Sequence, residues 1–231
     1  MGAILKGDRR MGLHTSIIRM LEARRARARL RRRGALGDFH RAGGAALLED
    51  MPVSSDDVVI DGGGFEGNWT AAMLVRSGCS SVIFEPVPSF ATACRARFAR
   101  NARVTVHEAA LGGMERTARF AIDSLASSEH RARGPSAVDV PVIDASEVVR
   151  RLADRYRDVA CLKLNIEGGE YEVLERLLGD GTVLQCRSIL VQFHAQPDGW
   201  QGRMADIHAG LARSHEATWR FPMVWELWTR R

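Results

Sequence analysis

The expected fold follows from one stretch of sequence, Asp57-Val-Val-Ile-Asp61-Gly-Gly-Gly-Phe-Glu-Gly67. Its first half is apolar and β-branched, which predicts a buried strand that ends at Asp61. The glycines that follow predict a tight loop, and the segment Asn68–Ser77 predicts a helix. A strand, a glycine-rich loop and a helix in this order are typical of the start of a nucleotide-binding α/β sheet.

The sequence downstream repeats the alternation of strands and helices. Further strands are predicted at Ser81–Glu85, Val104–Glu108, Ala160–Asn165 and Ser188–Phe193, and helices at Pro88–Asn101, Ala145–Tyr156, Gly169–Leu178 and Met204–Ser214. Because parallel neighbours need crossover connections, this alternation predicts a Rossmann-like α/β sheet, mostly parallel, with helices on both faces. An antiparallel strand is expected at the C-terminus, within a closing pair at Thr218–Phe221 and Val224–Trp228.

The segment between the predicted strands Val104–Glu108 and Ala160–Asn165 has a different sequence pattern. Arg116–Asp123 and Ala137–Ile143 resemble a pair of strands, and antiparallel pairing is one arrangement open to them. The polar stretch Ser124–Ser136 lies between them. A polar loop of that length inside a compact domain is expected either to cover a site or to be disordered.

The positive charge of the chain is concentrated at its start. The formal net charge is +5, but residues 1–41 hold 12 Lys and Arg against 3 Asp and Glu, which is +9 and leaves −4 for the rest. We therefore divide the chain into a basic helical N-terminal appendage, residues 1–50, and one α/β domain, residues 51–231. A helix at Thr15–Arg33 is expected in the appendage, and nucleic-acid binding by the mildly acidic body is not expected.

The cysteines and the hydropathy pattern bear on the compartment. The four cysteines are far apart, form no C-x-x-C pair and are expected to be reduced and buried, namely Cys79, Cys94, Cys161 and Cys186. No apolar run approaches the roughly 18 to 20 residues of a membrane span. We expect a cytoplasmic protein without a transmembrane segment.

The glycine loop alone does not choose between a dinucleotide and S-adenosylmethionine. Gly62, Gly64 and Gly67 satisfy the pattern G-x-G-x-x-G, and Glu85 follows 18 residues after the last of them. A dinucleotide would bring its pyrophosphate against this loop, where an acid such as Asp61 would repel it. S-adenosylmethionine brings an ammonium and a sulfonium group instead, so we predict S-adenosylmethionine as the cofactor.

This hypothesis assigns roles to the residues at the strand ends. Asp61 is expected to favour the positive charge of the ligand, and the loop glycines to let the backbone approach the methionyl part. Glu85 is expected to accept hydrogen bonds from the ribose hydroxyls, and the end of the third strand to meet the adenine edge. The predicted cofactor-binding residues are Asp61, Gly62, Gly63, Gly64, Gly67, Glu85, Pro86, His107 and Glu108.

Four blocks of sequence carry a family resemblance, namely Val59-Ile-Asp-Gly-Gly-Gly-Phe-Glu-Gly67, Phe84-Glu-Pro-Val-Pro88, Ala109-Ala-Leu-Gly112 and Leu162-Lys-Leu-Asn-Ile-Glu-Gly-Gly-Glu170. In order and spacing they resemble the FkbM family of methyltransferases. The resemblance implies a class I methyltransferase sheet and S-adenosylmethionine as the methyl donor. It also implies O-methylation of a hydroxyl of a sugar, a glycolipid or polysaccharide, or a polyketide-type natural product.

One position departs from the family pattern Lys-x-Asp-x-Glu-Gly, because Asn165 stands where the family has Asp. An amide can form hydrogen bonds but cannot act as a base. If the family carboxylate removes a proton or binds a metal, that role must move elsewhere or be lost. We predict no metal site, although Glu167 and His194 together could offer ligands.

Methyl transfer to a hydroxyl asks for a base near the acceptor. His194 follows the apolar run of the fifth strand and is our first choice for that base. Glu167 follows the fourth strand, where it could orient the acceptor hydroxyl, bind the ligand ammonium or cap the next helix. Asn165 is the third predicted catalytic residue, as a hydrogen-bonding group. Glu170 is interpreted as a helix-dipole or salt-bridge residue.

Two alternatives stay open at this point. The basic N-terminal segment could serve methylation of RNA, and the loss of the Asp at Asn165 could mark a protein that binds S-adenosylmethionine without catalysis. The leading hypothesis keeps a small-molecule or glycan hydroxyl as the acceptor. In that case the arginine cluster would at most touch anionic surfaces.

Overall fold

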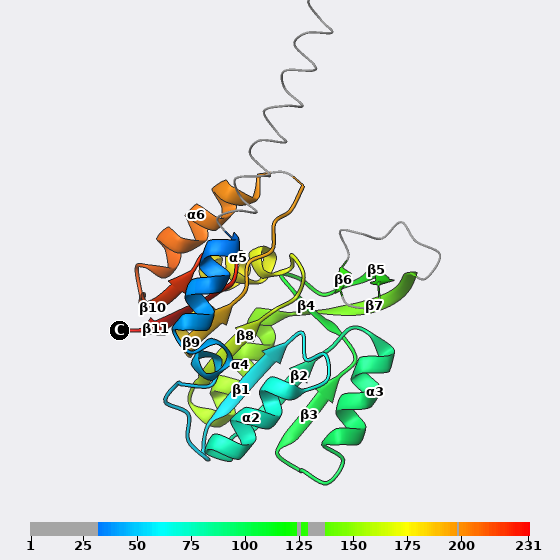
Figure 1. Cartoon of the computed structure of the whole chain (residues 1–231). Coiled ribbons are helices and arrows are strands. Elements are labelled where there is room, and N and C mark those ends of the chain that lie inside the picture. Colours follow the sequence, from blue (N-terminus) through cyan, green and yellow to red (C-terminus); the bar gives the residue numbers. More distant parts are fainter. Residues whose placement is uncertain (1–31, 124–125, 129–136, 198) are drawn as a thin grey trace, which may run out of the picture.

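A seven-stranded sheet runs through the centre of the molecule (Figure 1), in a computed structural model that describes residues 32–123, 126–128, 137–197 and 199–231. The strand order is β10-β11-β9-β8-β1-β2-β3, and among these strands β11 alone runs against the others. This confirms the predicted sheet, mostly parallel with one antiparallel C-terminal strand. The strands are β1 (Val58–Gly62), β2 (Ser80–Phe84), β3 (Val104–His107), β8 (Val159–Leu164), β9 (Cys186–Val191), β10 (His215–Phe221) and β11 (Trp225–Arg230).

Helices cover both faces of this sheet, because neighbouring residues of a strand point to opposite faces. Val58 and Ile60 of β1 pack in the larger apolar core, on the face covered by α4, α5 and α6. Val59 points the other way and packs with Met73 of α2. The helices are α2 (Asn68–Ser77), α3 (Pro88–Arg97), α4 (Ala145–Tyr156), α5 (Glu170–Gly179) and α6 (Trp200–Leu211), with short 3-10 turns η1 (Gly44–Leu48) and η3 (Thr182–Gln185).

A second, four-stranded sheet is inserted between β3 and α4. It consists of β4 (Ala110–Gly112), β5 (Arg116–Asp123), β6 (Ala126–Ser128) and β7 (Ala137–Asp144), in the order β4-β7-β5-β6. β5 pairs antiparallel with β7, so the two strands predicted here form a pair. Apart from β6, the polar stretch Ser124–Ser136 lies outside the described residues, and its covering role stays a prediction.

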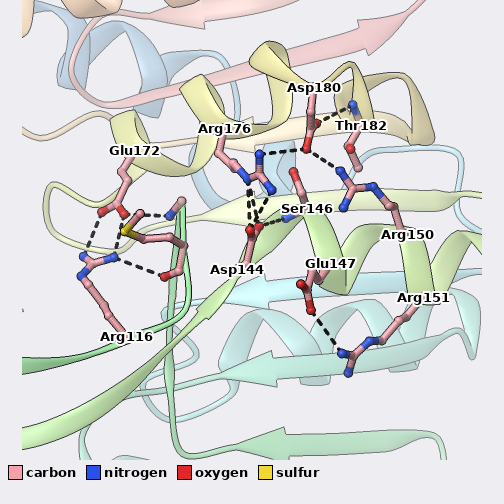
Figure 2. Close-up of polar contacts among 12 residues, drawn as sticks. Arg116, Asp144, Ser146, Glu147, Arg150, Arg151, Glu172, Arg176, Asp180 and Thr182 are labelled. Atoms are coloured by element: carbon pink, nitrogen blue, oxygen red, sulfur yellow. Dashed lines mark hydrogen bonds and ion pairs between the residues drawn. The ribbon is translucent and has the colours of Figure 1, made fainter.

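An ion-pair network fastens α4 to α5 (Figure 2). Asp144 caps α4 by accepting a hydrogen bond of 2.8 Å from the Ser146 backbone, and it also accepts one of 3.0 Å from Nε of Arg176 in α5. Asp180, at the end of α5, pairs with Arg176 at 3.4 Å and contacts Arg150 of α4. The network holds the two helices in fixed register, and α5 begins beside the site described below.

The described part of the N-terminal segment packs against the C-terminal hairpin. Residues 32–41 form a helix, in which Ala35 and Phe39 are buried against Val224. The Phe39 ring meets Phe221 edge to face at 5.5 Å between centroids. Most of the helix predicted at Thr15–Arg33 lies outside the described residues, and the domain boundary at residue 50 stays a prediction.

Replacing Phe39 by alanine should therefore destabilise the whole domain. Phe39 is 6% exposed and fills a small cluster, so the F39A substitution should cost about 3 kcal/mol of unfolding free energy in urea. Leu36, on the same helix but 41% exposed, is the matched control, and L36A should cost less than about 0.5 kcal/mol. Equal costs for the two variants would show that this helix does not pack on the domain.

Candidate active site

A cavity of about 310 Å³ lies at the carboxyl ends of β1, β2 and β8, between the glycine loop and the second sheet. In open α/β sheets this edge is where ligands bind. The walls are largely apolar, and the charged side chains that line the cavity are Glu85, Glu167, Glu172 and Arg116. Of the predicted site residues, the cavity brings together Gly63, Glu85, Pro86, Asn165 and Glu167.

The glycine loop is shaped by the backbone of the neighbouring strand. Gly63 has φ 77°, and a Cβ atom there would lie 2.0 Å from the Asn165 carbonyl oxygen. A Cβ atom at Gly64 would lie 2.3 Å from the Ile83 side chain. Gly62 ends β1 and Gly67 directly precedes α2. Of the four predicted loop glycines, Gly63 is the one that lines the cavity. Larger residues would push the loop outward and close the space beside it.

Asp61 is fully buried, and both of its carboxylate oxygens have partners inside the protein. Nζ of Lys163 in β8 donates to Oδ1 at 2.7 Å, and the Thr70 hydroxyl of α2 donates to Oδ2 at 2.8 Å. Lys163 also donates to the Gly63 carbonyl at 2.8 Å. Asp61 thus holds the glycine loop through Lys163. A contact between Asp61 and the ammonium group of a ligand stays a prediction. Lys163 was not a sequence-based candidate, and a lysine inside an apolar strand is the signal that could have indicated this pair.

Glu85 sits at the end of β2 with its carboxylate facing the cavity. Its Oε2 atom accepts a hydrogen bond of 2.7 Å from the Phe65 backbone, and Oε1 accepts one of 2.9 Å from Val87. Each oxygen keeps a further lone pair for a ligand. Burial raises the pKa of the Glu85 carboxyl above its ordinary value, against the two backbone hydrogen bonds and the nearby charge of Lys163, which lower it.

The two residues predicted to meet the adenine edge lie outside the cavity lining. The exposed His107 ring stacks on Phe84 at 4.9 Å, and Glu108 pairs with Arg95 at 2.8 Å. The corresponding wall is apolar and comes from the second sheet, with Ala110 and Leu111 of β4, Phe120 of β5 and Val142 of β7. The block Ala109–Gly112, which the sequence analysis used only for the family resemblance, is the sequence signal for this wall.

An arginine and a glutamate line the cavity where the second sheet meets α5, and Figure 2 shows the contacts between their side chains. Nη1 of Arg116 donates to Oε1 of Glu172 at 2.7 Å and Nη2 to Oε2 at 3.0 Å. The Gly113 backbone donates to the same Oε1 at 2.8 Å. This two-pronged pair fixes the position of β5 on the helix. Neither residue was a sequence-based candidate.

Asn165 and Glu167 follow β8 at the floor of the cavity. Oδ1 of Asn165 is buried and has no hydrogen-bond partner among the described residues. Since a buried carbonyl oxygen without a partner is costly, this atom is suited to receive a donor from a ligand. Glu167 has φ 53°, a left-handed conformation that non-glycine residues rarely adopt, and its side chain is partly exposed.

His194 follows β9 and lies behind Glu167 rather than in the cavity wall. Its Nδ1 atom is 2.8 Å from Oε1 of Glu170, and its Nε2 atom is 3.4 Å from Oε1 of Glu167. Burial lowers the pKa of His194, but the hydrogen bond and charge of Glu170, aided by Glu167, outweigh burial and raise the pKa above its ordinary value. Glu170, which the sequence analysis interpreted as a helix-dipole or salt-bridge residue, therefore contacts a predicted site residue.

In the part of the chain that the structure describes, no group of three or more His, Cys, Asp or Glu side chains is arranged to hold a metal ion. Over the same residues, no helix has the length and apolar character needed to cross a membrane.

A mostly parallel seven-stranded sheet, with its cavity at the strand ends and an antiparallel strand near the C-terminus, is the Rossmann-like architecture of methyltransferases. Residues 60–221 match the family described as the methyltransferase FkbM domain, so the chain belongs to the FkbM methyltransferase family. It thus carries a methyltransferase domain of a family that generally uses S-adenosylmethionine.

One solved structure supports the same fold. The crystal structure of methyltransferase FkbM from Methylobacillus flagellatus KT is similar over 81% of this chain, with a TM-score of 0.51 and 14% identity. This chain spans 46% of that protein's length. A putative rRNA-methylase from Clostridium thermocellum matches over 77% of this chain and 88% of its own, with a TM-score of 0.47 and 12% identity. No curated protein sequence matches the chain.

The Asp61–Lys163 pair should be essential for the stability of this site. Replacing Lys163 by methionine leaves a buried carboxylate with an unpaired charge, which should cost about 3 to 5 kcal/mol of unfolding free energy in urea. The K163M/D61N double variant removes that charge. It should be destabilised by clearly less than the sum of the two single variants. Strictly additive costs would show that the two groups do not interact.

Proposed function

We propose that this protein binds S-adenosylmethionine in the cavity and transfers its methyl group to a hydroxyl group of a sugar, a glycolipid or polysaccharide, or a polyketide-type natural product. The observation that carries the proposal is the Glu85 carboxylate, buried at the end of β2 with a lone pair on each oxygen open to the cavity. A pair of vicinal ribose hydroxyls is the donor set that matches such an acceptor.

The charge of the cavity favours a cationic ligand over a diphosphate. Its lining holds three carboxylates and one guanidinium, and that guanidinium is bound to Glu172. Lys163, which contacts the loop, is engaged by Asp61. A pyrophosphate would meet net negative charge here, whereas a sulfonium and an ammonium group would be attracted. This electrostatic argument supports S-adenosylmethionine, which when bound supplies an electrophilic methyl group on sulfur.

The remaining lining residues fit the other parts of that cofactor. Gly63 lets the backbone come close to the methionyl part, and the unpartnered Oδ1 of Asn165 can accept a hydrogen bond from its ammonium group. Pro86 and the apolar wall of the second sheet offer an environment for the adenine ring. On this assignment the roles expected of His107 and Glu108 pass to Phe120 and Val142.

A hydroxyl acceptor is supported by the acid and imidazole at the end of β8 and β9. Methyl transfer needs positioning of the acceptor oxygen and removal of its proton. Asn165 cannot take that proton, but Glu167 lines the same cavity and His194 lies 3.4 Å from Glu167, so loss of the family's Asp does not remove every base from the site. We also propose a cytoplasmic location, which the four free, buried cysteines support.

Ligand-induced thermal stabilisation tests the cofactor. S-adenosylhomocysteine at 100 times its Kd should stabilise the native state by about 2.7 kcal/mol and raise the melting temperature, whereas NAD should leave it unchanged. Tritiated S-adenosylmethionine should then label acceptors in a panel of methyl glycosides and simple phenols. Stabilisation by NAD and not by S-adenosylhomocysteine would reject the proposed function.

The affinity for S-adenosylhomocysteine should depend on the protonation of Glu85. Acidification through the raised pKa of Glu85 removes acceptor capacity, so the affinity measured by calorimetry should fall as the pH drops. The E85Q substitution should weaken binding by about 1 to 3 kcal/mol at neutral pH and abolish that pH dependence. E108Q is the control and should bind like wild type. A stronger effect of E108Q than of E85Q would reverse the assignment.

A further inference from the structure

A single buried carboxylate organises the loop between β8 and α5. Glu170 is fully buried, and its Oε1 atom accepts hydrogen bonds from the Ile166 backbone at 2.9 Å and from Nδ1 of His194 at 2.8 Å. Its Oε2 atom accepts a third hydrogen bond, from the Gly168 backbone at 2.9 Å. Both oxygens are therefore committed to one loop and one imidazole ring, which lie in different parts of the sequence.

These contacts determine how His194 is oriented. A carboxylate only accepts hydrogen bonds, so Nδ1 of His194 carries the proton and Nε2 holds the lone pair when the ring is neutral. The His194 backbone is held as well, because the Tyr171 hydroxyl donates to its carbonyl at 3.0 Å. The amide of Gln196 donates in turn to the Gly168 carbonyl. The imidazole and the loop form one hydrogen-bonded unit.

The order of the three side chains along this unit decides their roles. Glu167 lines the cavity, whereas neither His194 nor Glu170 does. The Nε2 atom of His194 faces Oε1 of Glu167 at 3.4 Å, on the side of the imidazole ring away from Glu170, which contacts Nδ1. Moreover, Glu167 adopts a strained φ of 53°, which places its side chain where a regular conformation would not.

We infer that Glu167 is the group that takes the proton of the acceptor hydroxyl, and that His194 and Glu170 are positioning residues behind it. The inference rests on the proposed function and reverses the order expected from sequence, in which His194 was the first choice for the base. In the step, the acceptor O–H bond breaks and its proton goes to the Glu167 carboxylate. The acceptor oxygen forms a bond to the methyl carbon as the carbon–sulfur bond breaks, and the electron pair stays on sulfur.

The proton can then leave Glu167. Glu167 can pass it to the Nε2 lone pair of His194, and the resulting imidazolium is stabilised by Glu170. The charged groups that face His194 are Glu170, Glu167 and, from the helix over residues 32–41, Arg32, which lowers the pKa of His194 while the two glutamates raise it. Since the neutral ring receives the proton, turnover should rise with pH through the raised pKa.

The E167Q substitution tests the inference without requiring a known acceptor. In nuclear magnetic resonance titrations of the ring nitrogens, the pKa of His194 should lie above 6.5 in wild type and fall in E167Q, because one facing carboxylate is lost. Calorimetry should give an affinity for S-adenosylhomocysteine within about twofold of wild type. For any labelled acceptor of the panel, kcat should fall by about 100-fold or more.

The opposite pattern would overturn the inference. An unchanged pKa of His194 in E167Q, a loss of S-adenosylhomocysteine affinity of about tenfold or more, or a retained kcat would each show that Glu167 is a cofactor-binding or merely structural residue. If wild type itself fails to bind S-adenosylhomocysteine, the proposed function fails, and the titration still reports whether the Glu167–His194–Glu170 chain exists.

The E170Q substitution tests the positioning role, with E175Q as control. Glu175 lies on the same helix at the surface, paired with Arg203 at 2.7 Å. E170Q should lower the pKa of His194 and shift the acid limb of the pH–rate profile by the same amount, whereas E175Q should change neither. If the pKa of His194 changes in E170Q but the acid limb of the pH–rate profile does not shift, the proposed role of His194 is wrong. Should E170Q not fold, E167Q decides alone.

Discussion

The buried ion pair between Asp61 and Lys163 is the interaction on which the rest of this structure depends. The two residues are direct neighbours in the parallel pairing of β1 and β8, and their side chains are almost completely removed from water. A buried pair is stable only when its remaining hydrogen-bonding capacity is used, and here Thr70 and the carbonyl of Gly63 use it. The register of two central strands, the start of α2 and the course of the glycine loop are thereby fixed together. The glycine loop, held in this way, contributes Gly63 and Phe65 to the cavity lining.

The walls of the cavity differ in their chemistry. The tips of β2 and β8 contribute acids and an unpartnered amide oxygen, while the second sheet contributes an apolar wall that Arg116 and Glu172 anchor to α5. Glu170 fixes the β8–α5 loop as Lys163 fixes the glycine loop. In each case one buried charged side chain forms hydrogen bonds with several backbone groups at once. The backbone groups of both loops are therefore held by charged side chains, Lys163 and Glu170, that lie buried beneath the cavity wall.

Much of the fold could be predicted from the sequence because its signals are local. The glycine loop, the apolar strands and the alternation with helices specified β1, α2 and the parallel sheet, and α2 spans the predicted residues. Glu85 could be predicted as well, since a strand of known length places its last residue at the sheet edge. His107 and Glu108 could not be excluded from the cavity, because their exclusion depends on where the inserted sheet packs. The roles of Lys163 and Glu170 depend on contacts between residues far apart in sequence, which periodicity does not report.

A crystal grown with S-adenosylhomocysteine and NAD together tests the central claim most directly, namely that the acid-lined cavity at the strand ends selects a phosphate-free, positively charged nucleoside. The account predicts S-adenosylhomocysteine in the cavity, with its ribose hydroxyls on the Glu85 carboxylate and its ammonium group on Oδ1 of Asn165. A diphosphate bound against Gly63, with NAD in place of S-adenosylhomocysteine, would contradict it.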